Sequence, residues 1–163
     1  MTHLQKKFKF DLCICGHTFK DTIYILEEFP KESSDTRMSS VLHRFGGIFN
    51  TIRGIRHLNK KINMKAVTIL GKDQDGETAI QELKKINVNH KSIAQNNLTN
   101  NVLVFISKLK STKTVIVRFL SKKPKKKMNI ADSSWVHFMY LDNKAFIQQF
   151  GNLVLDKKPD QFF

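Results

Sequence analysis

Gly16-His17-Thr18-Phe19-Lys20-Asp21, Gly46-Gly47-Ile48-Phe49-Asn50 and Gly71-Lys72-Asp73-Gln74-Asp75-Gly76 are the stretches that decide the fold of this chain. The first follows Phe10–Cys15 and the third follows Ala66–Leu70, two short runs with the composition of β-strands. Apolar residues at three- and four-residue spacing predict one helix that begins in the second stretch and another that begins in the third. The helix faces are Ile48, Ile52, Ile55 and Leu58, then Ala79, Ile80, Leu83 and Ile86.

Strands that alternate with helices predict an α/β fold with a mainly parallel sheet covered on both faces. Further strands are predicted at 22–26, 36–43, 101–106, 114–119, 135–140 and 152–155, with a short helix at 143–150. The loop Leu109–Lys113 makes a hairpin of two of these strands. The strands near 22–29, 36–43 and 101–119 interrupt the alternation, so we expect them to form a separate small sheet.

Size and composition fit one cytoplasmic globular domain. The chain has 163 residues, of which 40% are hydrophobic and 26% charged. No apolar run approaches the roughly 20 residues of a membrane helix. Cys13 and Cys15 are neighbours on one face of a strand, where we expect small buried side chains in a reducing compartment, and not a disulfide or a zinc site.

The chain is strongly basic, with a net charge of +14 and twelve Lys or Arg but no acid between Glu82 and Asp132. Such a balance fits either a binding surface for nucleic acid or charges spread over solvated faces. We favour the second, because only Lys122–Lys127 is a true run, and Pro124 makes it a loop. Phe105 and Phe119 also fit a buried strand pattern better than a platform for stacking bases.

Asp21 is the main candidate for ligand binding. In open parallel sheets, ligands bind beyond the carboxyl ends of the strands, and the turn from Gly16 to Asp21 is expected at that edge. A carboxylate there accepts hydrogen bonds from two sugar hydroxyls. The alternative is an acid that only forms a turn.

Gly46 and Gly47 allow backbone amides to approach a ligand at a helix N-terminus, and Asn50 offers an amide side chain to another hydroxyl. The alternative is a plain tight turn. The stretch from Gly71 to Gly76 lacks the later acid of a calcium loop, so it is interpreted as a strand-to-helix turn capped by Asp75. No metal site is predicted, and His137 is interpreted as a core residue of its strand.

The order of these elements resembles the front half of the PfkB/ribokinase family of sugar and nucleoside kinases. The pattern is a strand ending in Gly, Asp five residues on, Phe-Pro, Gly-Gly with Asn, Gly-x-Asp-x-x-Gly and a Thr, here Thr99, before a lid strand. The resemblance runs from about Phe10 to Val136. It implies a ribokinase-like three-layer α/β/α fold with a small β-sheet lid. The main part would comprise about 10–16, 47–95 and 134–163, and the lid strands about 21–45 and 99–119.

The resemblance implies that Asp21, Gly46, Gly47 and Asn50 contact the sugar or nucleoside, with Asp142 as a weaker candidate. It also implies ATP and Mg²⁺ as cofactors, and a homodimer formed through the lid strands. One departure concerns the glycines, because the family places Asn four residues after the second Gly, whereas Asn50 is three after Gly47.

The family's catalytic Gly-x-Gly-Asp does not occur in this sequence. In the family, its Asp takes the proton of the hydroxyl and its amides hold the phosphate. We therefore expect kinase ancestry in a truncated chain that is inactive by itself and lacks most of the ATP site. The alternative interpretations are a non-catalytic sugar-binding or dimerisation module and, less favoured, a basic nucleic-acid-binding protein.

Overall fold

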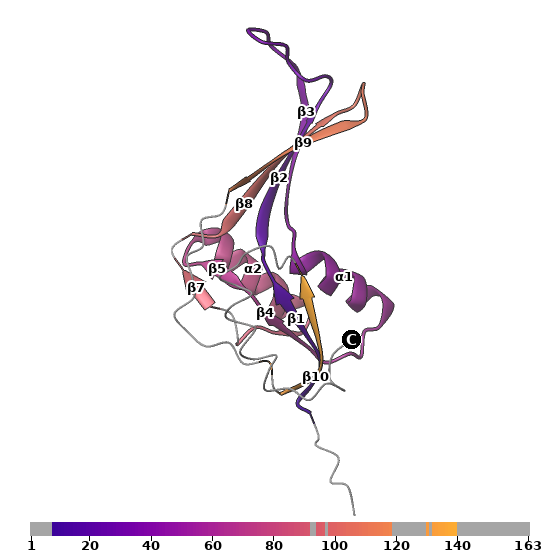
Figure 1. The fold of residues 1–163 in the computed structure, drawn as a ribbon, viewed down its shortest axis with the longest axis vertical. Coiled ribbons are helices and arrows are strands. Elements are labelled where there is room, and N and C mark those ends of the chain that lie inside the picture. Colours follow the sequence, from indigo (N-terminus) through magenta and orange to yellow (C-terminus); the bar gives the residue numbers. More distant parts are fainter. Residues whose placement is uncertain (1–7, 92–93, 97, 119–129, 131, 140–163) are drawn as a thin grey trace, which may run out of the picture.

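The computed structural model describes residues 8–91, 94–96, 98–118, 130 and 132–139. Within these ranges the chain forms an α/β body and a second sheet that projects away from it (Figure 1). We call the sheet of the body the inner sheet and the projecting one the outer sheet.

The inner sheet is parallel throughout and has the strand order β10-β1-β4-β6. Its strands are β1 (Phe10–Gly16), β4 (Met64–Val67), β6 (Val88–Asn89) and β10 (Ser133–Met139). The predicted alternation of strands and helices is therefore confirmed for the body. Antiparallel pairing is confined to the outer sheet.

Helices α1 (Ile48–Leu58) and α2 (Gln74–Lys85) pack on one face of the inner sheet. They form one core with Ile14, Met64 and Ala66, to which α1 contributes Ile48, Phe49 and Ile52, and α2 contributes Ala79 and Leu83. The prediction of Leu58 as a core residue is wrong, since its side chain is 85% exposed. The buried residues of α1 lie in its N-terminal half, and Leu58 is its last residue.

The predicted strand at 66–70 is two strands, because the chain breaks at Thr68 between β4 and β5 (Ile69–Gly71). Thr68 is fully buried, and its hydroxyl lies 2.9 Å from the hydroxyl of Thr18. Beyond the break, β5 leaves the inner sheet and pairs in parallel with β7 (Ala94–Asn96). This change of partner directs Gly71 and the start of α2 towards the outer sheet.

The outer sheet has the strand order β3-β2-β8-β9. Its strands are β2 (Phe19–Leu26), β3 (Met38–Phe45), β8 (Asn100–Ser107) and β9 (Thr112–Arg118). The two central strands are parallel, and each edge strand pairs in the antiparallel direction. The separate small sheet and its hairpin are as predicted. However, β2 begins at Phe19, because its pairing with β8 already starts there.

One face of the outer sheet is mainly apolar, with Ser40 and Lys113 as polar residues on its edge strands. The register places Ile23 beside Leu42 and Val104, and Val104 beside Val115. Because side chains two residues apart share a face, this apolar face comprises Ile23, Ile25, Leu42, Val102, Val104, Ile106, Val115 and Val117. Asp21 and Arg44 occupy its inner end, next to the body.

Cys13 and Cys15 are buried without a disulfide between them, and their sulfur atoms lie 3.4 Å apart, as expected of small side chains inside the protein. His137, by contrast, is exposed, so its interpretation as a core residue is wrong. In the described part of the chain, no helix is both long enough and apolar enough to cross a membrane. Asp142, the basic run Lys122–Lys127, and the predicted elements at 143–150 and 152–155 lie outside the described residues.

Candidate functional site

Asp21 lies inside β2, not in a turn, and the prediction of a turn at this position is wrong. In the register it stands between Arg44 on β3 and Val102 on β8. Its side chain is only 14% exposed, and the nearest cation is the Arg44 guanidinium, with Nε 3.9 Å from Oδ2. Among the described residues, no donor forms a hydrogen bond with this carboxylate.

The burial of Asp21 affects its protonation. Burial raises the pKa of this carboxyl above its ordinary value, while the positive charges of Arg44 and Arg53 act in the opposite direction. A buried carboxylate normally accepts several hydrogen bonds. Asp21 therefore has acceptor capacity that the described part of the protein does not use.

Gly46 provides the space for the Asp21 carboxylate. A Cβ atom on Gly46 would lie 2.9 Å from Oδ1 and 3.0 Å from Cγ of Asp21, and still closer to Oδ2. The Gly46 amide donates to the carbonyl oxygen of Phe19 at 2.9 Å. This amide already has an acceptor within the protein, and what Gly46 contributes beside Asp21 is the absence of a side chain.

Gly47 forms the corner that begins α1. Its φ of 64° and ψ of −130° lie in a region that favours glycine. A Cβ atom there would collide with the carbonyl oxygen of His17, which also accepts a hydrogen bond from the Ile48 amide at 3.0 Å. The first amides of α1 are thus partly engaged by the protein itself.

Asn50 lies in the first turn of α1, and its side chain is exposed. Its backbone amide donates to the Gly47 carbonyl at 3.1 Å, whereas its side-chain amide makes no hydrogen bond to another described residue. Asp21 touches Gly46, and Asn50 follows Gly46 by one helical turn. The sequence candidates therefore gather where β2, β3 and the N-terminus of α1 meet.

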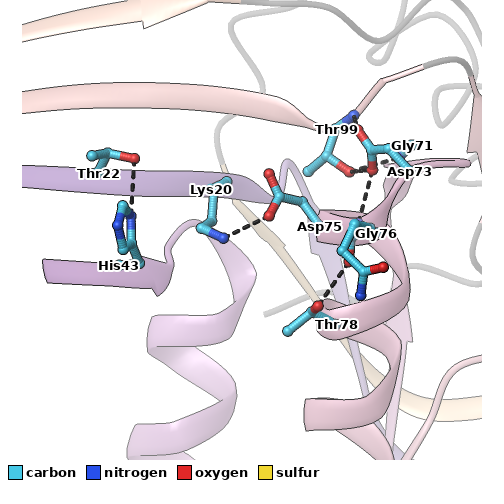
Figure 2. Close-up of polar contacts among 10 residues, drawn as sticks. Lys20, Thr22, His43, Gly71, Asp73, Asp75, Gly76, Thr78 and Thr99 are labelled. Carbon is cyan, nitrogen blue, oxygen red and sulfur yellow. Dashed lines mark hydrogen bonds and ion pairs between the residues drawn. The ribbon is translucent and has the colours of Figure 1, made fainter.

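Asp73, and not Asp75, caps α2, which corrects the prediction. Its Oδ1 accepts hydrogen bonds from the Gly76 amide at 2.8 Å and from the Thr99 hydroxyl at 2.7 Å, and its Oδ2 accepts the Thr99 amide at 2.7 Å (Figure 2). The Gly71 amide in turn donates to the Thr99 hydroxyl at 2.9 Å. Burial opposes ionisation of Asp73, but the bonds from Thr99 and Gly76 lower its pKa overall. This cluster fastens the start of β8 to the start of α2.

Asp75 has a different partner, which the sequence did not reveal. The Lys20 ammonium lies 2.6 Å from Asp75 Oδ1 (Figure 2). The same nitrogen lies 5.4 Å from the centre of the Phe45 ring. Lys20 directly precedes Asp21 in β2, while Asp75 is in the first turn of α2. The pair therefore ties the base of the outer sheet to the body. In the sequence, Lys20 lies next to Asp21, and nothing in the pattern indicates a contact with Asp75.

A cavity of about 690 Å³ lies elsewhere, at the outer ends of β2 and β8. Its lining includes Glu27, Pro30, Asp35, Arg37 and Lys108, and none of the four predicted site residues. Glu28, which also lines the cavity, pairs with Lys110 at 2.8 Å. This cavity is far from the carboxyl ends of the inner strands, where ligands of open parallel sheets bind, so we do not regard it as the substrate site.

Binding of ATP and Mg²⁺ requires oxygen ligands for the metal ion and amides for the phosphates. The described residues contain no group of three or more His, Cys, Asp or Glu side chains placed to hold a metal ion. The sequence has no Gly-x-Gly-Asp stretch. No described residue is therefore assigned to ATP or Mg²⁺, and no step of a reaction is assigned to either.

Comparison with known proteins agrees with this geometry. The profile of the pfkB family of carbohydrate kinases matches residues 9–160, and the chain belongs to this family. No curated protein sequence matches the chain significantly.

Among solved structures, a nucleoside kinase of Methanocaldococcus jannaschii, an archaeal member of the ribokinase family, is similar with a TM-score of 0.66 and 19% identity, over 80% of this chain and 44% of its own. An Arabidopsis thaliana ribokinase complexed with ribose and ATP has a TM-score of 0.63 and 16% identity, over 79% of this chain and 45% of its own. A ribokinase of Cryptococcus neoformans var. grubii in complex with ADP has a TM-score of 0.62 and 10% identity, over 80% of this chain and 42% of its own.

These likenesses establish the ribokinase-like fold. The chain spans less than half the length of each of these three proteins.

Proposed function

We propose that this chain is the substrate-binding part of an ATP-dependent kinase that phosphorylates a hydroxyl of a sugar or nucleoside. Asp21 accepts hydrogen bonds from two hydroxyls of the substrate and so fixes its orientation. The observation that carries this proposal is the state of Asp21, a carboxylate with 14% exposure and no hydrogen-bond donor among the described residues. Keeping such a group ionised is unfavourable without a ligand, and substrate hydroxyls supply the missing donors.

The neighbouring residues complete this binding role. Gly46 keeps the space beside the Asp21 carboxylate open, Gly47 sets the start of α1, and the Asn50 side chain bonds a further hydroxyl. The outer sheet, formed by β2, β3, β8 and β9, acts as the lid, and the described residues within 10–16, 47–91 and 134–139 belong to the main part. Lys20 and Thr99 lie where this lid joins the main part, and their bonds to α2 hold the lid base in place.

Phosphoryl transfer depends on positioning and on charge stabilisation around the transferred group. Family membership implies ATP and Mg²⁺ for that step. The 163-residue chain carries no Gly-x-Gly-Asp stretch, so we expect it to bind a sugar or nucleoside without phosphorylating it. ATP-dependent phosphorylation by the purified chain would contradict this expectation.

The test is equilibrium binding of a panel of pentoses, hexoses and nucleosides to the purified chain by calorimetry. We expect at least one to bind, and Asp21→Asn to weaken it by about 100-fold, since a charged acceptor is lost. Asp35→Asn is the matched control, because Asp35 lines the outer cavity and not the proposed site. Loss of binding in Asp35→Asn with normal binding in Asp21→Asn would move the site to that cavity.

A second candidate function is a non-catalytic sugar-binding module that dimerises through the outer sheet. The observation that favours it is the exposure of its apolar face, where Leu42 is 52%, Val115 45% and Val117 46% exposed. Aliphatic side chains gathered on one face of a sheet favour association with another apolar surface. We propose a homodimer through this face. We also propose a cytoplasmic location, which is supported by two buried cysteines that form no disulfide. Light scattering tests the first, since a monomer at high protein concentration would contradict it.

A further inference from the structure

We propose that Arg53 is a positioning residue of the Asp21 site. Arg53 holds the peptide group between Phe45 and Gly46 against the Asp21 carboxylate, and Glu82 of α2 holds Arg53. The inference rests on the proposed function, because it concerns the same binding site, but its test includes a measurement that needs no ligand.

The guanidinium of Arg53 is fixed from three sides. Its Nη1 donates to the Phe45 carbonyl at 2.8 Å, its Nε donates to Glu82 Oε1 at 2.8 Å, and its Nη2 lies 2.5 Å from the same oxygen. The guanidinium carbon lies 5.5 Å from the centre of the Phe49 ring. A planar fork with this many partners has little freedom to move.

The Phe45 carbonyl and the Gly46 amide belong to one peptide group, which is planar and rigid. Arg53 binds the carbonyl side of this group, while the amide side donates to Phe19 of β2 at 2.9 Å. The plane is therefore clamped between α1 and β2. Its orientation places Gly46 against the carboxylate of Asp21, two residues after Phe19.

This chain of contacts links three elements to one carboxylate. Glu82 on α2 orients Arg53 on α1, and Arg53 orients the peptide that bounds Asp21 on β2. If the Arg53–Glu82 pair were purely structural, it would only join α1 to α2, and its loss would affect the stability of the protein alone. A positioning role also affects the geometry at Gly46 and the affinity for substrate hydroxyls.

Arg56 provides a matched control on the same helix. It donates to the backbone carbonyls of Lys60, Ile62 and Asn87, at 2.6, 2.9 and 3.2 Å. Its bonds resemble those of Arg53 in kind, but they lie at the other end of α1 and do not reach Asp21. The conservative variants Arg53→Lys and Arg56→Lys both keep the positive charge and lose the planar guanidinium with its several donors.

Two measurements on the full chain separate the possibilities: the dissociation constant of a bound sugar or nucleoside at about pH 8, and the hydrogen-exchange rate of the Gly46 amide by NMR. We expect Arg53→Lys to weaken binding about tenfold and to speed Gly46 exchange about tenfold, because a small misplacement of a binding group is costly. Arg56→Lys should leave both within about twofold of wild type, whatever it does to the melting temperature.

Equal effects of the two variants, or no effect of Arg53→Lys on Gly46 exchange, would overturn the inference. If the wild-type chain binds no sugar or nucleoside, the proposed function fails. The exchange rate of Gly46 then still decides whether Arg53 holds that peptide.

Discussion

Replacing Gly46 by alanine is the change that separates a binding role of Asp21 from a structural one. The new Cβ would lie 2.9 Å from Asp21 Oδ1, about half an ångström short of ordinary contact, and closer still to Oδ2. Unlike Gly47, Gly46 has no positive φ, so its backbone conformation accepts alanine without strain. The carboxylate therefore has to rotate away, while the chain around it stays in place.

The expected cost differs between stability and binding. Alanine at a compatible glycine position stabilises by roughly 0.4–1 kcal/mol through the unfolded state, which offsets part of the lost contact. We therefore expect the free energy of unfolding to change by less than about 1 kcal/mol. Displacing the carboxylate from the substrate hydroxyls should weaken binding by roughly 10- to 100-fold, or about 1.4–2.7 kcal/mol.

The assay is calorimetric binding of the best sugar or nucleoside, together with urea unfolding, for Gly46→Ala, Asp21→Asn and the double variant. Because the two groups touch, their effects on binding should not add, and Gly46→Ala should cost little once Asp21 is replaced. Additive losses in the double variant would refute the reasoning. So would normal binding by Gly46→Ala with a fully folded protein.

Three further predictions concern stability. Asp21→Asn should raise the melting temperature at pH 7: burial raises the pKa of Asp21 in the folded state, so its stabilisation is present at low pH and is lost as pH rises through that value. The gain over wild type should therefore shrink in a melting series taken to lower pH and be gone below 3.8, the ordinary pKa of this carboxyl. Thr99→Val leaves the buried Gly71 amide without its acceptor and should cost about 2 kcal/mol in urea unfolding, whereas Thr99→Ser should restore most of it. Gly47→Ala should cost about 3 kcal/mol or more, because its φ of 64° and the His17 carbonyl both exclude a side chain; a loss below about 1 kcal/mol would contradict that account.

Much of the architecture was predictable because local patterns and tertiary packing agree. The apolar spacing of α1 and α2, the strand composition of β1 and the hairpin of β8 and β9 each follow from sequence-local chemistry. The resemblance to the PfkB family also predicts the second sheet. Leu58 shows the limit of periodicity, because a repeat does not reveal where a helix passes beyond the sheet it covers.

The details of the site were less predictable because they depend on contacts between distant segments. Asp73 and Asp75 are both suitable caps by residue type, and the bonds that Asp73 makes with Thr99, 26 residues away, decide between them. Asp21 was placed in a turn because its strand pairing with β8 is non-local. Sequence spacing gave no sign of the Lys20–Asp75 pair or of the contact between Arg53 and the Phe45 carbonyl.

The central claim is that the carboxylate of Asp21 receives the hydroxyls of a sugar or nucleoside. The most direct measurement is the titration of the Asp21 carboxyl carbon by NMR, without ligand and with a saturating sugar or nucleoside. Hydroxyl donors stabilise the ionised form, so the account predicts that binding lowers a pKa which burial raises in the free protein. A ligand that saturates the chain and leaves the titration of Asp21 unchanged would contradict it.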